Sequence, residues 1–425
     1  MNLKRSFVLF VSLLFLNLLS AEGKILTIED AVRLAKENNI SVKKAENTLD
    51  NLALKNKYSW NSVSPTATLN GNFSDNLEND SSTFSLSGAV NLSLKTNLYS
   101  EINGAKLNYE KGLLTYSEAV RQIELSVRKK FYNLIYQKEN LVLQNRSLET
   151  SRTQYLNNEE KFKNGKISEL DALTSRVNYE SKKPVVESAE INFQNDLASF
   201  KQLLGIPQET EIALDGSLDD FLNLKEISFG LLPKVDEPAP DVKSAEYDVE
   251  IAKNSLLNLR FSAYAPVITG SYSYGKSKKS MQDDWMTTNQ LSVGVSVPLD
   301  GILPWSSSAV NIKKQKNALD TAEKVLEDAK TTVAVQTESY IRKINQAVKQ
   351  LDSLKSTEKL AEQTYKMTLA AYNYGKTDFL SLQNANDSVL SAGVNLKSQA
   401  YTLISTILDL ESVLGLEFGT LETKK

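Results

Sequence analysis

The chain carries two copies of the same series of sequence patterns, and this duplication limits its possible folds more than any other feature. Each copy reads as a helix, two strands, a long helix, a glycine-centred tip and a returning helix. The segment Asp241–Glu246 resembles Ser41–Glu46 at an offset of 200 residues, and Gly375 follows Gly165 at an offset of 210. A repeat this regular predicts two halves of similar structure.

A seven-residue apolar spacing predicts a long helix in each copy. Consecutive matches of this kind are typical of coiled-coil-like packing. A helix of about sixty residues would reach about 90 Å, which is longer than a compact domain requires. In the first copy, the apolar line at this seven-residue spacing consists of Leu113, Val120, Val127, Leu134, Leu141, Leu148, Tyr155 and Phe162. In the second copy, it consists of Leu319, Leu326, Val333, Tyr340, Ala347, Leu354 and Ala361.

Strict alternation of apolar and polar residues predicts four strands, each with one apolar and one polar face. In residues 83–95, for example, Phe84, Leu86 and Val90 alternate with serine, alanine and asparagine. Such strands cannot stand alone in lipid, because open edges leave backbone groups unpaired. A closed barrel needs about eight strands, so four per chain imply an oligomer. The alternative is a soluble sandwich whose apolar face packs on another sheet.

The expected organisation begins with a signal peptide at residues 1–21, in which Lys4 and Arg5 precede an apolar stretch. A retained N-terminal anchor is the alternative. Pro184 should bend or interrupt the helix that contains it. The remaining expected boundaries are a first repeat at 22–205 (helix 26–60, strands 66–75 and 83–95, long helix 101–161, tip 162–167, returning helix 168–204), a connector at 206–240, a second repeat at 241–415 (helix 241–262, strands 267–275 and 289–299, long helix 307–371, tip 372–377, returning helix 378–414) and a tail at 416–425.

Composition removes several classes of function. The chain has no cysteine and no histidine, which excludes disulfides, thiol chemistry, Cys/His zinc sites and catalytic triads with a histidine base. The net charge of −3 gives no basic field for nucleic acid. No acidic pair or Ser-Lys pair stands out as catalytic. We therefore expect a protein that is not an enzyme and uses no cofactor.

These patterns together resemble the TolC family of outer-membrane channel proteins. The matching pieces are the sequence of Leu26–Val32, the Phe/Tyr-x-x-Gly motif at both tips, and Leu-Gly followed by Ile206 or Leu416 at both helix ends. The resemblance implies an α+β membrane protein, a homotrimer with a shared twelve-stranded outer-membrane β-barrel continuous with a periplasmic α-helical barrel. It also implies an exit duct of a tripartite efflux pump or type I secretion system. Such a duct docks with a periplasmic adaptor protein and an inner-membrane transporter, and passes small molecules or proteins outward.

The resemblance also assigns roles to the two tips. Asp171 and Tyr372 are placed like partners in the hydrogen-bonded closure of the family. Thr377 replaces a basic residue of some relatives, while Ser381 and Asn384 replace acidic ones, so the pore constriction would comprise Asp171, Tyr372, Thr377, Ser381 and Asn384. Ordinary solvated tip residues are the alternative. The expected adaptor-docking residues are Phe162, Gly165, Lys166, Ser168, Leu170, Tyr372, Gly375, Lys376, Asp378 and Leu380.

Two other classes of function remain open. A passive porin would not need long periplasmic helices, and a soluble periplasmic scaffold or adaptor would not need strands of this type.

Overall fold

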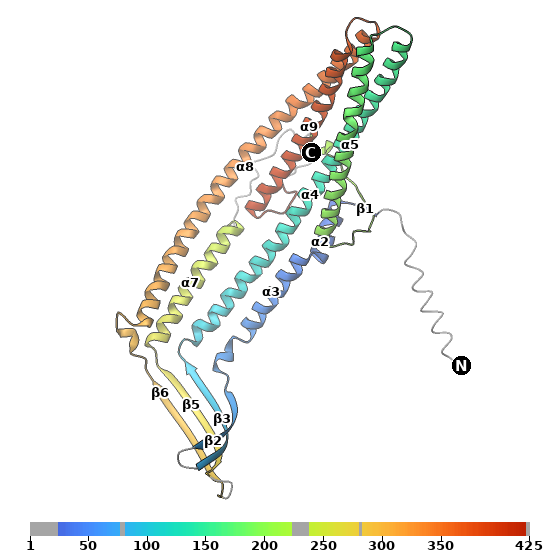
Figure 1. The fold of residues 1–425 in the computed structure, drawn as a ribbon. Coiled ribbons are helices and arrows are strands. Elements are labelled where there is room, and N and C mark those ends of the chain that lie inside the picture. Colours follow the sequence, from blue (N-terminus) through green and yellow to red (C-terminus); the bar gives the residue numbers. More distant parts are fainter. Residues whose placement is uncertain (1–23, 77–80, 223–237, 280–282, 422–425) are drawn as a thin grey trace, which may run out of the picture. The chain divides into compact units, whose positions relative to one another are not determined.

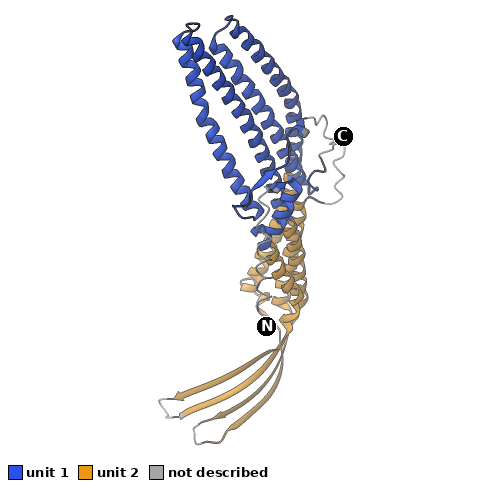
Figure 2. Cartoon of the chain, turned by 90° about the vertical axis from the view of Figure 1, so that its right-hand side faces the viewer, with its two compact units in different colours: residues 1–44, 118–239, 333–425 blue, residues 45–117, 240–332 orange. Residues whose placement is uncertain are grey.

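A computed structural model describes residues 24–76, 81–222, 238–279 and 283–421 (Figure 1). The expected signal peptide lies outside the described residues. The chain divides into two compact units, shown in different colours in Figure 2: unit 1 comprises residues 1–44, 118–239 and 333–425, and unit 2 comprises 45–117 and 240–332. Each unit therefore combines segments from both sequence repeats.

Unit 2 contains a four-stranded antiparallel sheet in the order β2-β3-β5-β6. Two of its strands, β2 and β6, form the edges and have one neighbour each. The 3₁₀ helix η2 (Ser59–Val63) precedes the first strand. The strand bounds are β2 Thr66–Asn76, β3 Ser81–Lys95, β5 Val267–Lys278 and β6 Met286–Ser296.

The register of this sheet gathers apolar side chains on one face. Phe73 lies opposite Phe84, and Tyr272 lies opposite Val90 on one side and Leu291 on the other. Positions one residue along pair polar side chains, as in Ser271 with Asn91. The period of two therefore sorts the strands into one apolar and one polar face, as the alternation predicted.

The strand β6 ends three residues earlier than the expected residue 299. Its last residue, Ser296, pairs with Val267, the first residue of β5. The chain before Val267 is Pro266, which has no N–H to donate to a ladder. Residues 297–299 therefore have no strand to pair with.

The helical part of unit 2 is held together by side-chain amides. Its helices are α7 (Pro240–Tyr264) and segments of α3 (Ile40–Lys57), α4 (Leu98–Lys163) and α8 (Ser307–Asn373). The Asn254 amide nitrogen donates to the Ser100 carbonyl oxygen at 2.7 Å, and the Asn103 amide donates to the Asn254 side-chain oxygen at 2.9 Å. Asn254 is largely buried, so these bonds satisfy both ends of its amide.

Unit 1 packs its helices around a core that includes Phe131, Leu134, Phe200 and Leu403, all buried. Its short strands β1 (Lys24–Leu26) and β4 (Ile212–Leu214) pair in parallel. The helices confined to unit 1 are α2 (Ile28–Asn38), α5 (Glu169–Leu204), α6 (Asp219–Leu222) and α9 (Phe379–Leu414).

The first expected helix, 26–60, is not continuous. Residues 24–26 form β1, and the helix breaks at Asn39, whose backbone is extended. The Asn39 side chain donates to the Leu203 carbonyl oxygen at 2.7 Å and accepts the Ser41 N–H at 2.8 Å. A side chain that bonds nearby backbone in this way competes with the helix.

Pro184 does not interrupt α5, which runs without a break from Glu169 to Leu204. Contacts with α4 hold the helix on both sides of the proline. Asn178 donates to Ser151 at 3.4 Å on one side, and Gln137 donates to Asp196 at 2.6 Å on the other. Tertiary packing therefore overrides the local preference.

The carboxylate of Glu411, which is fully buried, fixes the segment after α9 through hydrogen bonds. It accepts the backbone N–H of Gly419 at 3.0 Å and of Leu421 at 2.8 Å. Arg121 donates to the Glu411 carbonyl oxygen at 2.6 Å and lies 5.0 Å from the centre of the Phe418 ring. Burial raises the pKa of the Glu411 carboxyl despite these donors.

Among the described residues, no helix is both long and apolar enough to cross a membrane.

Candidate functional site: the two hairpin tips

The first tip joins α4 to α5 through a left-handed glycine. Gly165 has φ +67°, and an added Cβ would meet nothing within 4 Å, so backbone conformation rather than space requires glycine here. The Lys166 N–H bonds to the Lys161 carbonyl oxygen at 2.8 Å and the Gly165 N–H to the Phe162 carbonyl oxygen at 2.9 Å. These bonds satisfy carbonyls that the end of α4 would leave unpaired.

The second tip joins α8 to α9 with the same geometry. Gly375 has φ +66°, and the Lys376 N–H bonds to the Ala371 carbonyl oxygen at 2.8 Å. The returning helices begin with different caps: Ser168 accepts the Asp171 N–H at 3.1 Å, and Asp378 accepts the Ser381 N–H at 2.6 Å. That backbone N–H lowers the pKa of the Asp378 carboxyl.

Both tips lie at the same end of unit 1 (Figure 1). They present large apolar side chains to solvent. Leu170 is 73% exposed, Leu380 58% and Tyr374 80%. Lys166 and Lys376 are also exposed. Exposed apolar residues rimmed by lysines are typical of a protein-binding surface.

Tyr372 is the central contact between the two hairpins near the tips. Its hydroxyl donates to the side-chain oxygen of Asn158 on α4 at 2.6 Å. Its ring lies 6.0 Å from that of Phe379 and 4.6 Å from the Lys161 ammonium. Burial raises the pKa of the Tyr372 phenol, and the nearby Asp171 charge acts in the same direction.

Within the single chain the Tyr372 hydroxyl bonds to Asn158, and the pairing with Asp171 that the resemblance implies stays a prediction. The Asp171 carboxylate accepts the Ser168 hydroxyl at 2.8 Å, because the two residues form a reciprocal helix cap. Asn158 is 1% exposed and provides the phenol with a buried acceptor.

The other expected constriction residues occupy the first turns of α9 and the loop before it. Thr377 and Ser381 are half-buried, and Asn384 is exposed. The Ser381 N–H is engaged by the Asp378 cap, while the Asn384 carbonyl oxygen accepts the Ser388 hydroxyl at 2.7 Å. Among the described residues, no hydrogen bond joins any of these three side chains to Asp171.

The sequence reasoning missed a stripe of buried polar residues on α4. Its members, at spacings of four, three and four, are Ser147, Ser151, Gln154 and Asn158. Lys182 on α5 donates to Ser147 at 2.8 Å and to Asp387 on α9 at 2.7 Å, which links both hairpins. A search for polar residues repeating at heptad spacing would have found this stripe, because it runs beside the apolar line.

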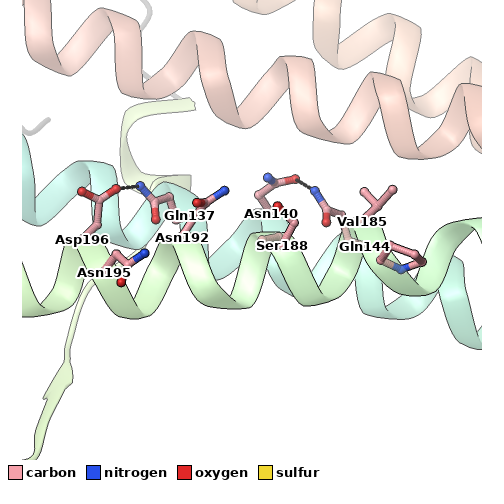
Figure 3. Close-up of a pocket in the computed structure, with 10 residues that line it drawn as sticks. Gln137, Asn140, Gln144, Val185, Ser188, Asn192, Asn195 and Asp196 are labelled. Atoms are coloured by element: carbon pink, nitrogen blue, oxygen red, sulfur yellow. Dashed lines mark hydrogen bonds between the residues drawn. The ribbon is translucent and has the colours of Figure 1, made fainter.

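A cavity of about 760 Å³ lies between α4 and α5 (Figure 3). Amide side chains dominate it, and the Gln137 and Gln144 side-chain oxygens are buried without a partner. No group of three or more acidic residues that could hold a metal ion occurs in the described part of the chain. The cavity therefore offers amide groups for hydrogen bonding.

Comparison with known proteins finds a family model that matches part of the chain. Residues 231–416 match the family model described as outer membrane efflux protein. The outer membrane protein TolC of Vibrio cholerae is 20% identical over 306 residues, which cover 71% of this chain and 69% of that protein.

Solved structures show a similar fold. The CmeC outer membrane channel of Campylobacter jejuni matches with a TM-score of 0.79 and 18% identity, over 91% of this chain and 85% of that one. The outer membrane protein VceC of Vibrio cholerae matches with a TM-score of 0.73 and 13% identity, over 92% of this chain and 96% of that one.

Proposed function

We propose that this chain, a TolC-family outer membrane efflux protein, is the exit channel of a tripartite efflux pump. The family consists of channels in the outer membrane, not of enzymes. The observation that carries the proposal is the sheet of unit 2, which has an exposed apolar face, a polar face and two open edges. In lipid, such a sheet must close on itself or on copies of itself.

Closure by three copies accounts for the geometry of the sheet. A single sheet has four strands, and three copies supply twelve, which lies in the range of known outer-membrane barrels. The edge strand β2 of one copy would pair with β6 of the next. The lumen would then be lined by the polar face, whose residues are serine, threonine, asparagine and glycine for the most part.

Unpartnered stripes on α5 and α8 support a helical barrel formed by the same copies. Near the tips both stripes are apolar, with Leu173 and Val177 exposed on α5 and Leu360 and Met367 exposed on α8. Farther from the tips, polar Ser188 and Asn192 on α5 alternate with exposed Val185 and Ile191, and α8 exposes Gln346 and Ser353. In a ring, α5 of one copy would meet α8 of the next, and the exposed apolar residues near the tips favour that seam.

The tips serve as docking surface and gate in this proposal. The docking residues for a periplasmic adaptor are those exposed at the tips, with Leu170 and Leu380 as apolar anchors and Lys166 and Lys376 around them. An inner-membrane transporter would deliver the substrate through the adaptor. Tyr372 on Asn158 would hold the tip closed, while Asp171, Thr377, Ser381 and Asn384 would line the opening.

Because the chain has no cysteine, introduced cysteines test the trimer without background. Asn70→Cys on β2 would be combined with Thr288→Cys, Gln290→Cys or Ser292→Cys on β6, one at a time. We expect at least one pair to produce covalent trimers in the outer-membrane fraction. Recovery only as monomers, as eight-stranded dimers or from the soluble periplasm would reject the proposal.

A matched pair within one sheet provides the control. Asn91→Cys and Ser271→Cys replace residues that are register partners on β3 and β5. This pair should cross-link inside one chain and leave its mass unchanged.

A further inference from the structure

The segment Leu299–Trp305, which joins β6 to α8, carries four large apolar side chains that are exposed to solvent. Leu299 and Ile302 are each 66% exposed, Leu303 is 44% and Trp305 is 78% exposed. Single exposed apolar residues are common, but four within seven residues form a patch typical of a surface that contacts another protein or a membrane.

Hydrogen bonds to the backbone of the patch, together with close contact with α7, hold it in place. The Tyr264 hydroxyl of α7 donates to the Gly301 carbonyl oxygen at 3.0 Å. A Cβ on Gly301 would lie 2.8 Å from the Tyr264 ring and 2.9 Å from the Ala263 carbonyl oxygen, so this close approach requires glycine. The Ser306 N–H also bonds to the Leu303 carbonyl oxygen at 2.9 Å. The apolar side chains therefore lie on a turn that is fixed by contacts with α7.

In the sequence, the patch continues the apolar alternation of β6. Leu291, Val293 and Val295 of β6 are exposed on that face, and Val297 and Leu299 follow at the same spacing of two. Between Asp284 and Lys313, Asp300 is the only charged residue. If lipid covers the apolar face of β6, as proposed above, the same medium suits a neighbouring stretch that is almost free of charge.

Aromatic residues gather at this end of the sheet, where the strands join the helices. Trp60 precedes β2, Tyr99 follows β3 and Tyr264 precedes β5; all three are exposed. Tryptophan and tyrosine favour the boundary between headgroups and acyl chains, because their rings are apolar and their N–H or O–H remains solvated.

We infer that the Leu299–Trp305 segment is a lipid anchor outside the strands, which inserts Ile302, Leu303 and Trp305 into the interfacial layer of the periplasmic leaflet. This inference rests on the proposed outer-membrane function. It assigns the patch to lipid and not to a neighbouring copy of the chain.

Tryptophan fluorescence in reconstituted vesicles tests the anchor. The chain has three tryptophans, so Trp60→Phe with Trp285→Phe leaves Trp305 as the sole emitter. The trimer would be placed in phosphatidylcholine brominated either close to the headgroup or near the acyl terminus. We expect Trp305 to lose more emission to the shallow bromines than to the deep ones. Quenching by aqueous iodide instead, or by neither quencher as in a protein interface, would overturn the inference.

A second probe separates this inference from the proposed function. Val293→Trp, in a background with all three native tryptophans replaced by phenylalanine, reports on the apolar face of β6. If bromolipid quenches this probe but does not quench Trp305 in the single-tryptophan variant, the anchor is refuted. The proposal of an outer-membrane channel is then unaffected. If the Val293→Trp probe is not quenched by either bromolipid, the membrane placement of the sheet fails, and the anchor fails with it.

Discussion

Replacing Tyr372 by phenylalanine removes one hydroxyl and keeps the ring between Phe379 and Lys161. The loss leaves the side-chain oxygen of Asn158 without its donor, in a position that is 1% exposed. The Asn158 amide nitrogen is already buried without a partner. An unsatisfied buried polar group costs about 1–3 kcal/mol. If the bond exists only in the closed tip, the closed state of each protomer weakens about 5- to 150-fold relative to the open state.

Single-channel conductance in planar bilayers measures this shift. We expect Tyr372→Phe to raise the fraction of time spent in high-conductance states. Tyr374→Phe is the matched control, because it removes the same hydroxyl from a side chain that is 80% exposed and two positions away. Equal conductance of the two variants would contradict the role of Tyr372.

A double-mutant cycle with Asn158→Leu isolates the pair. Removing both polar groups leaves no unsatisfied amide, so the double variant should open less than the sum of the single variants predicts. A coupling energy of zero would refute the reasoning. Burial raises the pKa of the phenol above its usual value near 10, so its contribution is complete below that value and is lost only as pH rises through the raised pKa. Channel closure should therefore not depend on Tyr372 titration at neutral pH.

Two further predictions concern stability. Gly165→Ala should lower the free energy of unfolding by about 1–2 kcal/mol in a denaturant titration, because the left-handed backbone disfavours a Cβ. Gly270→Ala is the control and should not show this loss. A Cβ there also meets nothing within 4 Å, but the backbone is not left-handed. Glu411→Gln should cost about 1–3 kcal/mol at low pH, because an amide nitrogen then faces a backbone N–H. Since the folded pKa of Glu411 is raised, its favourable contribution is complete below the usual glutamate pKa of 4.5 and is lost as pH rises through the folded pKa. The melting temperature of the wild type should thus fall relative to that of the variant as pH increases; a difference independent of pH would contradict the burial argument.

The sequence predicted most of the regular structure because the signals were periodic. The alternation around Phe84 and Leu291 identified both faces of the sheet, and the register confirms them. The break at Asn39 was not predicted, because the sequence on both sides of it is helical. The residue that accepts its side-chain hydrogen bond, Leu203, lies 164 residues away. The same reason applies to Tyr372, whose partner Asn158 is 214 residues distant in sequence. Periodicity reports which face a residue occupies, but not which side chain it meets across the fold.

The pairing of β1 with β4 has a consequence for the order in which the chain can fold. Lys24 pairs with Ile212, so 188 residues separate the partners. In the proposed export, which starts from the N-terminus, β1 would reach the periplasm long before β4 and would have no strand to pair with until residue 214 had emerged. The closing of so long a loop carries an entropic cost that packing must first offset, so the α4–α5 hairpin should assemble earlier than this ladder. The β1–β4 ladder should therefore form late, only after the whole first repeat has been delivered.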